Sequence, residues 1–266
     1  MKIGVCGAGG RMGRAITRIA HERGHVVLAA FEHPASPLLG ADAGALAGLS
    51  PTGTVVETVS ARALARVDGI LDFTAPAATV ETVEAASALG KCAVIGTTGL
   101  SADQMARIER CAAGAPLLVS PNMSLGVNVL FKLTQIAARV LNDGFDIEVF
   151  EAHHRNKKDA PSGTARRLID IVKSSAQPLG EAKEMYDRVG SQGARSNDEI
   201  GIQVLRGGDI VGEHTVFFVG EGERLELTHR ATNRDILARG AVLAFEYLSD
   251  KKPGMYSMFD VLGLSW

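Results

Sequence analysis

The chain has 266 residues, of which 46% are hydrophobic, 22% charged and 5% aromatic, and its formal net charge at pH 7 is −2. This length suits one large or two modest domains with ample core, and the balanced charge and few aromatic residues argue against nucleic acid as a partner. No apolar run approaches a membrane span and the start of the chain does not resemble a signal peptide, so we expect a cytoplasmic protein without a membrane partner.

Three scattered cysteines, Cys6, Cys92 and Cys111, show neither metal-ligand spacing nor a disulfide framework. We expect them to be reduced, buried and inert. We also expect that the protein has no metal site.

The first predicted elements are a buried strand at residues 2–6 and a helix at residues 14–22, joined by a glycine-rich turn. A strand, a glycine turn and a helix form the context of a dinucleotide-binding fingerprint, in which small residues admit the pyrophosphate and the helix start offers free N–H groups. The spacing is GxxGxxG through Gly7, Gly10 and Gly13, in place of the usual GxGxxG. Because a glycine motif alone is a weak signal, the following strand matters.

An acidic residue, Glu32, stands at the end of that next predicted strand, residues 26–31. In this context we interpret Glu32 as a ligand of the adenosine ribose hydroxyls; the alternative is an exposed loop carboxylate. His33 follows it, and Arg11 lies in the glycine turn. Both side chains could accept a 2′-phosphate, so these residues leave the choice between NAD and NADP open.

Three further strands are predicted at residues 69–73, 91–95 and 116–119, and they alternate with helices at residues 77–89 and 101–112. This alternation predicts an α/β fold with a Rossmann-like doubly wound parallel sheet, in which ligands bind at the carboxyl ends of the strands. Ordinary turn chemistry explains each of these ends taken singly. Together they are fit to approach a nicotinamide or ribose; they carry Phe73, Thr74, Gly96, Thr97, Thr98, Pro121, Asn122 and Met123.

The pattern changes near residue 124, where a long apolar helix is predicted to extend to residue 141. A strand ending at Glu151 and a helix at residues 165–172 follow. The polar stretch at 177–197 is expected to be a mobile loop or an excursion with little regular structure. The remaining elements are three strands in antiparallel hairpins and a last helix, predicted at residues 200–205, 210–219, 224–229 and 236–248. The sequence therefore predicts a second, α+β domain built on a mixed sheet.

The run EAHHRNKKDAPSGT, residues 151–164, combines two adjacent histidines, three cations and a helix start. Ser162 is a good N-cap, and the amides of Gly163 and Thr164 would point out of the helix N-terminus toward an anion. A histidine titrates near neutral pH and can therefore donate or accept a proton there. We interpret the run as a place where an anion is held and a proton is moved; the alternative is a solvated basic loop.

Six motifs in order make the chain similar to a known family: GAGGRMGR, DFTAP, GTTG, PNMSLGVN, EAHHRNKKDAPSGT and GEHTV. The chain resembles the dihydrodipicolinate reductases, also called 4-hydroxy-tetrahydrodipicolinate reductases, of bacterial lysine and diaminopimelate biosynthesis. The resemblance covers nearly the whole chain. It implies that NADH, NADPH or both reduce a cyclic dicarboxylate substrate, and that the protein is a homotetramer.

The resemblance also implies roles for particular residues. His153 would be the proton donor, Lys157 would help to polarise and protonate the substrate, and His154 would hold a substrate carboxylate together with the start of the helix at Ser162, Gly163 and Thr164. The cofactor would lie along Gly7, Ala8, Gly9, Gly10, Arg11 and Met12, with Glu32 at its ribose, and its nicotinamide side would be lined by Phe73, Gly96, Thr97, Thr98, Ser120, Pro121, Asn122 and Met123. The last helix and tail would return to the nucleotide domain, which gives domains of residues 1–123 plus 235–266 and of residues 124–234.

The chain departs from the commoner family pattern at three positions near the cofactor. Met123 stands where many members have phenylalanine, and His33 and Ala75 stand where arginines are frequent. Without those two guanidinium groups the affinity for a 2′-phosphate should be lower, so we expect NADH to be used at least as well as NADPH. Two other interpretations remain open: a different two-domain NAD(P)-dependent dehydrogenase, and a non-catalytic NAD(H)-sensing module.

Overall fold

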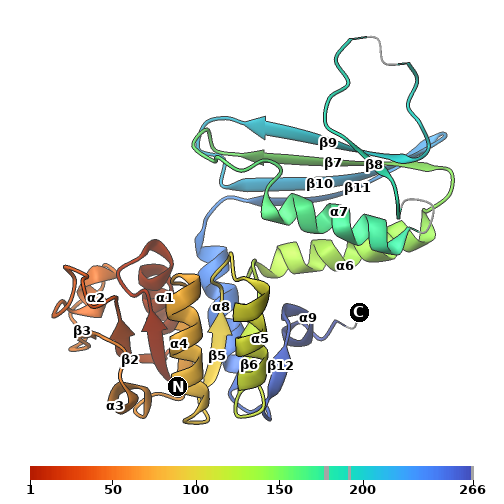
Figure 1. Cartoon of the computed structure of the whole chain (residues 1–266). Helices are drawn as coiled ribbons and strands as arrows, with labels where there is room; N and C mark the ends of the chain where they lie inside the picture. Colours follow the sequence, from red (N-terminus) through yellow and green to blue (C-terminus); the bar gives the residue numbers. More distant parts are fainter. Residues whose placement is uncertain (177–179, 191–192, 265–266) are drawn as a thin grey trace. The chain divides into compact units, whose positions relative to one another are not determined.

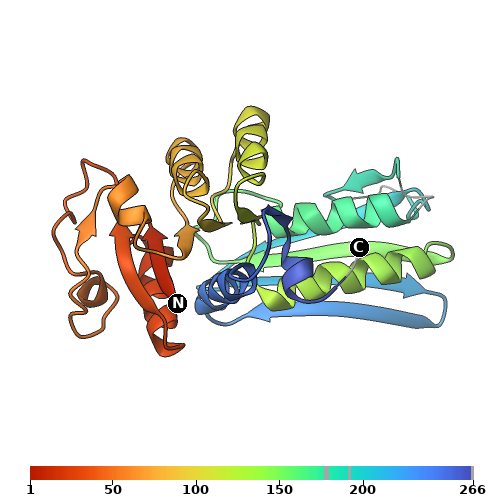
Figure 2. The same ribbon diagram turned by 90° about the horizontal axis from the view of Figure 1, so that it is seen from below.

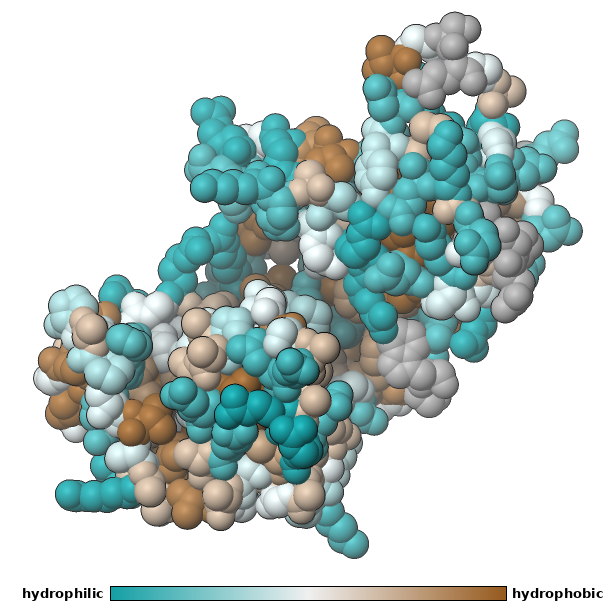
Figure 3. Space-filling view, in the orientation of Figure 1, coloured by the Kyte–Doolittle hydropathy of each residue, from teal (hydrophilic) through white to brown (hydrophobic). Residues whose placement is uncertain are grey.

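The computed structural model describes residues 1–176, 180–190 and 193–264, and the chain folds into two compact units (Figure 1). Among the described residues, the first unit contains those up to Ser124 and those from Asp235 to Leu264, and the second unit is Leu125–Arg234. Among the described residues, no helix has the length and apolar character needed to cross a membrane. On the face shown in Figure 3, hydrophobic side chains are scattered among hydrophilic ones.

The first unit is built on a seven-stranded sheet in which every pairing between neighbouring strands is parallel. The strand order is β12-β6-β5-β4-β1-β2-β3, so the chain order reverses between β1 and β4. The strands are β1 (Lys2–Cys6), β2 (Val26–Phe31), β3 (Val56–Glu57), β4 (Gly69–Asp72), β5 (Cys92–Ile95), β6 (Pro116–Val119) and β12 (Gly254–Tyr256). The predicted doubly wound sheet is confirmed, and its switch point is where such sheets bind ligands.

Helices cover both faces of this sheet, with α4 and α5 on one side and α8 on the other (Figure 2). The helices of the unit are α1 (Arg11–Glu22), α2 (Ala43–Leu46), α3 (Ala61–Leu64), α4 (Pro76–Ser87), α5 (Ala102–Cys111), α8 (Asp235–Leu248) and α9 (Met258–Val261). Because both faces are covered, the central strands read as continuous apolar runs. All four residues of β5 are buried, as are all four of β4.

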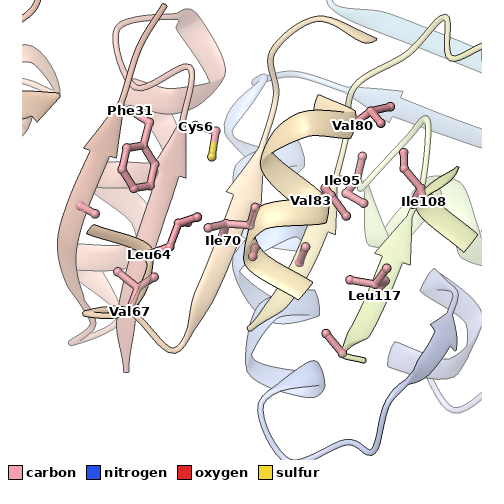
Figure 4. Packing of buried hydrophobic residues seen from close by; sticks show 14 of the residues in the cluster. Cys6, Phe31, Leu64, Val67, Ile70, Val80, Val83, Ile95, Ile108 and Leu117 are labelled. Atoms are coloured by element: carbon pink, nitrogen blue, oxygen red, sulfur yellow. The ribbon is translucent and has the colours of Figure 1, made fainter. Parts of the chain in front are cut away.

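Part of the core lies between the sheet and the helices α3, α4 and α5 (Figure 4). Phe31, Ile70 and Ile95 come from the strands, and Val83 and Ile108 come from α4 and α5. None of these five side chains is more than 1% exposed. This packing fixes the carboxyl ends of β1, β2 and β4, and with them the turns that follow those strands.

Three details of the first unit differ from the sequence expectations. Helix α1 begins at Arg11, three residues earlier than expected, so Arg11 and Met12 belong to its first turn. Residues 34–53, whose glycine, alanine and proline content predicts a loop, include the short helix α2. The end of the chain adds the strand β12 and the helix α9, which are too short to give a periodic signal.

The described residues of the second unit form two helices and a five-stranded sheet with the order β11-β10-β7-β9-β8. The elements are α6 (Leu125–Val140), β7 (Phe145–His153), α7 (Gly163–Ser175), β8 (Lys183–Met185), β9 (Glu199–Arg206), β10 (Gly212–Gly220) and β11 (Glu223–Ala231). Within this unit, α6 and α7 lie on one face of the sheet (Figure 1). Strands β7, β8 and β9 pair in parallel and β10 pairs antiparallel with both β7 and β11, so the predicted mixed sheet is confirmed.

The predicted hairpin of the strands at residues 200–205 and 210–219 is wrong. These strands are β9 and β10, and β7 lies between them, paired in parallel with β9 and antiparallel with β10. The expected hairpin of β10 and β11 does form. The polar stretch at 177–197 includes β8, which was not predicted; residues 177–179 and 191–192 of that stretch lie outside the described residues.

Candidate active site

The turn between β1 and α1 depends on glycine at two positions. Gly7 has φ +74°, a left-handed conformation that favours glycine, and a Cβ added there would lie 2.9 Å from the carbonyl oxygen of Phe73. A Cβ on Gly13 would lie 2.1 Å from the oxygen of Gly7. The amides of Gly7 and Ala8 both donate to the oxygen of Phe31. The backbone of the turn therefore packs closely against the carboxyl ends of β2 and β4.

The start of α1 presents free donors to any ligand at this turn. Its N-cap is Gly10, which has no side chain to accept from the first amides of the helix. Uncapped amides at a helix N-terminus, here those of Arg11 and Met12, form a binding site for an anion such as a pyrophosphate. The amide of Gly9 donates to Oε1 of Glu32 over 2.8 Å, which places the Glu32 carboxylate beside the turn.

A cavity of about 640 Å³ adjoins the turn at the carboxyl ends of β1, β2 and β4. Its volume lies in the range of small-molecule and cofactor sites. The lining includes Gly7, Glu32, His33, Thr74, Ala75 and Glu81. The first unit therefore fits a dinucleotide, with a glycine turn for the pyrophosphate and a carboxylate at the ribose position.

The turns after β4 and β5 are tied together by the buried carboxylate of Asp72. Its Oδ1 accepts from the hydroxyls of Thr74 at 2.8 Å, Thr79 at 2.8 Å and Thr97 at 3.0 Å. The hydroxyl of Thr97 also accepts from the amide of Thr74 over 3.0 Å. Because the Thr97 hydroxyl is engaged in this network, Thr97 would contact a cofactor through its backbone.

The other residues expected at the nicotinamide differ in exposure. Phe73 packs against Gly96, where an added Cβ would fall 2.0 Å from the Phe73 ring. The hydroxyl of Ser120 donates to the carbonyl of Asn122 over 2.8 Å. Met123 is only 1% exposed and therefore supports its turn from inside. The two that are exposed are Thr98 and Pro121.

In the second unit, the run at residues 151–164 forms the end of β7, a loop and the start of α7. Ser162 caps α7, accepting from the amide of Ala165 over 3.2 Å. Helix α7 begins at Gly163, whose amide has no acceptor within the helix, and Thr164 is the second helical residue. A Cβ on Gly163 would meet nothing within 4 Å. The helix start is thus open and suited to a carboxylate.

Of the two proposed proton-handling residues, His153 precedes this loop and Lys157 lies within it. His153 ends β7, its side chain is 11% exposed, and its Nδ1 bonds to a carboxylate oxygen of Glu151. Lys157 places its Nζ 2.9 Å from Oδ2 of Asp159, and this contact holds the pKa of Asp159 below its ordinary value. His154 is half-buried at the next position after β7, and its carbonyl accepts from the Lys157 amide.

Three residues of this neighbourhood have no role in the sequence analysis: Glu151, Arg206 and His214. Glu151 lies two residues before His153 on β7, and residues two apart share one face of a strand, so its place had a local signal. Arg206 comes from β9 and His214 from β10. Their approach depends on strand pairings far apart in the chain, for which the sequence contains no local pattern.

Burial and hydrogen bonding determine the charge states of Glu151 and His214. Burial opposes ionisation of Glu151, but hydrogen bonds from His153 and Arg206 outweigh it and lower the pKa of this carboxyl to about 2. For His214, burial and then the proximity of His153 lower the pKa to about 3. At neutral pH Glu151 is therefore an anion and His214 is neutral.

The side chains of Glu151, His153 and His214 also form a set of potential metal ligands, with one ligand atom of each within 4.8 Å of the others. Two imidazoles and a carboxylate are a common zinc donor set. Here, however, both Glu151 oxygens already accept from the Arg206 guanidinium. A cation beside that guanidinium would be repelled, so the geometry favours an ion pair over a metal centre.

Two family models match the chain in succession: the N-terminus of dihydrodipicolinate reductase over residues 1–123 and its C-terminus over residues 126–262. The chain belongs to the dihydrodipicolinate reductase family. It is thus an oxidoreductase. The C-terminal family model extends to residue 262, whereas in the structure the residues from Asp235 onward pack in the first unit.

Relatives and solved structures agree with this membership. A 4-hydroxy-tetrahydrodipicolinate reductase of Anaeromyxobacter dehalogenans is 51% identical over 99% of this chain and 98% of its own length. One from Syntrophotalea carbinolica is 48% identical over 99% of each chain. In fold, the chain is similar to dipicolinate-bound dihydrodipicolinate reductase from Paenisporosarcina sp. TG-14, at 23% identity, a TM-score of 0.78 and 98% of each chain covered.

A fold likeness extends to other dehydrogenases as well. Amine dehydrogenase from Mycobacterium smegmatis is 15% identical, with a TM-score of 0.62 over 97% of this chain and 95% of its own. At such identity the likeness concerns the fold alone, which is shared by enzymes of different function. The two reductases differ from the amine dehydrogenase in that they are 48% and 51% identical to this chain over 99% of its length.

Proposed function

We propose that the chain reduces 4-hydroxy-tetrahydrodipicolinate, or its dehydrated dihydro form, to tetrahydrodipicolinate, with His153 as the proton donor. Membership of the dihydrodipicolinate reductase family supports the reaction class. The residue assignment rests on one observation. A histidine bonded to a buried carboxylate ends β7, and the loop that follows it leads directly to the start of α7. A proton donor and a carboxylate-binding helix start are what reduction of an unsaturated cyclic dicarboxylate requires.

Residues of the first unit bind the cofactor. The uncapped start of α1 and the turn from Gly7 to Met12 receive the pyrophosphate, and Glu32 receives the adenosine ribose. NADH or NADPH, when bound, supplies the hydride. The turns after β4, β5 and β6 lie at the nicotinamide side, where Phe73 and Gly96 shape the wall and Asp72 keeps the threonine turns in place.

Residues of the second unit bind the substrate and move the proton. The amides of Gly163 and Thr164 and the side chain of His154 hold substrate carboxylate, and Lys157 supplies positive charge to the reacting ring. His153 delivers the proton that the reduced product needs. Ser162 contributes indirectly, because its hydroxyl already caps α7 and contacts His214.

The family resemblance supports a homotetramer in the cytoplasm, where reduced nicotinamide and the biosynthetic substrate are available. Light scattering after size exclusion should then give about four times the chain mass of 28.0 kDa. A mass of one or two chains would contradict the assembly and leave the reaction untouched.

A coupled assay tests the reaction itself. Dihydrodipicolinate synthase supplies the unstable substrate from pyruvate and aspartate semialdehyde, and absorbance follows the oxidation of NADH or NADPH. Rapid oxidation that depends on the synthase is the expected result. If the folded protein binds the cofactor but oxidises none of it, a different dehydrogenase substrate or a sensing role replaces this proposal.

A further inference from the structure

The carboxylate of Glu151 is fully buried and has partners on both oxygens. Oε1 accepts from Arg206 over 2.8 Å and from the amide of Ser162 over 3.1 Å. Oε2 accepts from Arg206 over 3.1 Å and contacts Nδ1 of His153. A buried charge is tolerated only when it is paired and hydrogen-bonded to this extent. The structure therefore keeps an anion at 0% exposure directly beside the proposed proton donor.

Strand geometry holds this anion in place. Glu151 and His153 share one face of β7, and the parallel pairing of β7 with β9 sets Arg206 opposite His153. The Arg206 guanidinium also donates to the carbonyl oxygens of Leu205 over 2.8 Å and Asp159 over 2.7 Å. With both ends anchored, the carboxylate has no freedom to follow the imidazole, so it fixes the orientation of the ring.

The contact also decides which ring nitrogen of His153 carries a permanent hydrogen. An ionised carboxylate can only accept, so a hydrogen bond from Nδ1 requires a hydrogen on Nδ1. Proton exchange is then left to Nε2. A Cβ on the facing Gly212 would lie 3.0 Å from Nε2, so the glycine keeps that nitrogen clear of a side chain. Among the described residues, the imidazole of His153 makes no second hydrogen bond.

We propose that Glu151, anchored by Arg206 and the Ser162 amide, is a positioning residue that holds a hydrogen on Nδ1 of His153 and leaves Nε2 to exchange the proton with substrate. The inference rests on the proposed role of His153 and adds the residue that directs it. The charged and titratable groups around His153 are Glu151 on β7, Arg206 on β9, His214 on β10, His229 on the neighbouring β11, and Lys157 in the loop. Of these five groups, the one bonded to Nδ1 is Glu151.

Nitrogen NMR of the unmodified protein tests the hydrogen placement without any change at Glu151. In protein with ¹⁵N-labelled histidine, the His153 signals are assigned by comparison with His153→Ala and followed through a pH titration. In the neutral ring, the hydrogen should be on Nδ1 and Nε2 should carry none. A neutral His153 that carries its hydrogen on Nε2 would overturn the inference, whatever the activity.

The variant Glu151→Gln tests the consequence for catalysis. Without the anion, the imidazole loses the acceptor that fixes its orientation and its Nδ1 hydrogen, so kcat should fall about tenfold or more and the pH profile of kcat should change. Glu151→Asp should restore part of both. The matched control is Glu199→Gln, which removes another buried carboxylate of the same sheet, one paired with Arg188 away from His153.

The outcomes separate this inference from the proposed function. If Glu151→Gln moves the hydrogen of His153 to Nε2 but leaves kcat and its pH profile as in wild type, Glu151 positions the ring and the proton-donor role of His153 fails. If kcat falls in both glutamine variants with no change in pH profile, Glu151 is structural only and the inference fails. If Glu151→Gln does not fold, the NMR titration of the unmodified protein decides.

Discussion

At the scale of single residues, the proposed cofactor selectivity depends on the side chains that line the cavity at the carboxyl ends of β1, β2 and β4. His33 and Ala75 both line it, and so do the carboxylates of Glu32 and Glu81. Among the described residues, no lysine or arginine belongs to this lining. A 2′-phosphate would therefore meet negative charge without a guanidinium partner, while ribose hydroxyls can donate to Glu32.

This lining predicts that kcat/KM for NADH is at least as high as for NADPH. Ala75→Arg should raise the ratio of NADPH to NADH kcat/KM about tenfold, since a charge-assisted hydrogen bond contributes about 1.5–3 kcal/mol. Ala88→Arg, at the exposed C-cap of the same helix α4, should leave the ratio unchanged. A wild-type preference for NADPH of more than tenfold would refute the argument.

At the scale of elements, β10 and the start of α7 meet through a histidine that stays neutral. Nε2 of His214 lies 3.1 Å from the hydroxyl of Ser162, and burial lowers the pKa of His214 from 6.5 to about 3. A group with a lowered basic pKa stays neutral in the folded chain while the unfolded chain takes up a proton. Neutral His214 therefore contributes its full share to the free energy of unfolding above pH 6.5, and this contribution is lost as the pH falls from about 6.5 toward 3.

His214→Gln should remove that loss while it keeps a polar partner for Ser162. Between pH 6 and 4, the free energy of unfolding of the wild type should fall more steeply than that of the variant, by up to about 1.4 kcal/mol per pH unit. The exposed His21 provides the control, and His21→Gln should follow the wild type. Denaturant unfolding at several pH values measures all three; parallel wild-type and His214→Gln curves would exclude a lowered pKa of His214 in the folded chain.

The elements also indicate what a sequence can predict. The first unit was predictable because its strands and helices alternate with clear apolar periodicity, and because Gly7 and Gly13 follow a strand and open a helix. The turn signal between β9 and β10 correctly indicated a chain reversal, but the two strands do not pair, because β7 enters between them. That insertion also brings Arg206 to Glu151. Non-local pairing is invisible to periodicity, so this half of the site was missed.

At the scale of the whole molecule, the first unit is made of two separate stretches of chain. Helix α8 covers the sheet of residues 1–124, and its Val242, Phe245 and Leu248 are fully buried. Burying one such side chain contributes about 1.5–3 kcal/mol, while a whole domain is stable by only about 5–15 kcal/mol. The first stretch alone should therefore lack the burial needed to fold.

A fragment of residues 1–124 should accordingly be unfolded by circular dichroism and should not bind NADH. Residues 1–124 joined by a glycine–serine linker to residues 235–266 should fold and bind it, since this chain restores α8 and β12. A cooperatively folded 1–124 fragment would show that the N-terminal stretch is independent of α8.

Replacement of His153 tests the central claim most directly. In the synthase-coupled assay, His153→Ala should lower kcat about 10²- to 10⁴-fold with a smaller effect on KM, because the proton donor acts in the transition state. His21→Ala should match the wild type. Wild-type turnover by a folded His153→Ala protein would contradict the account, since the donor bonded to Glu151 would then take no part in the reaction.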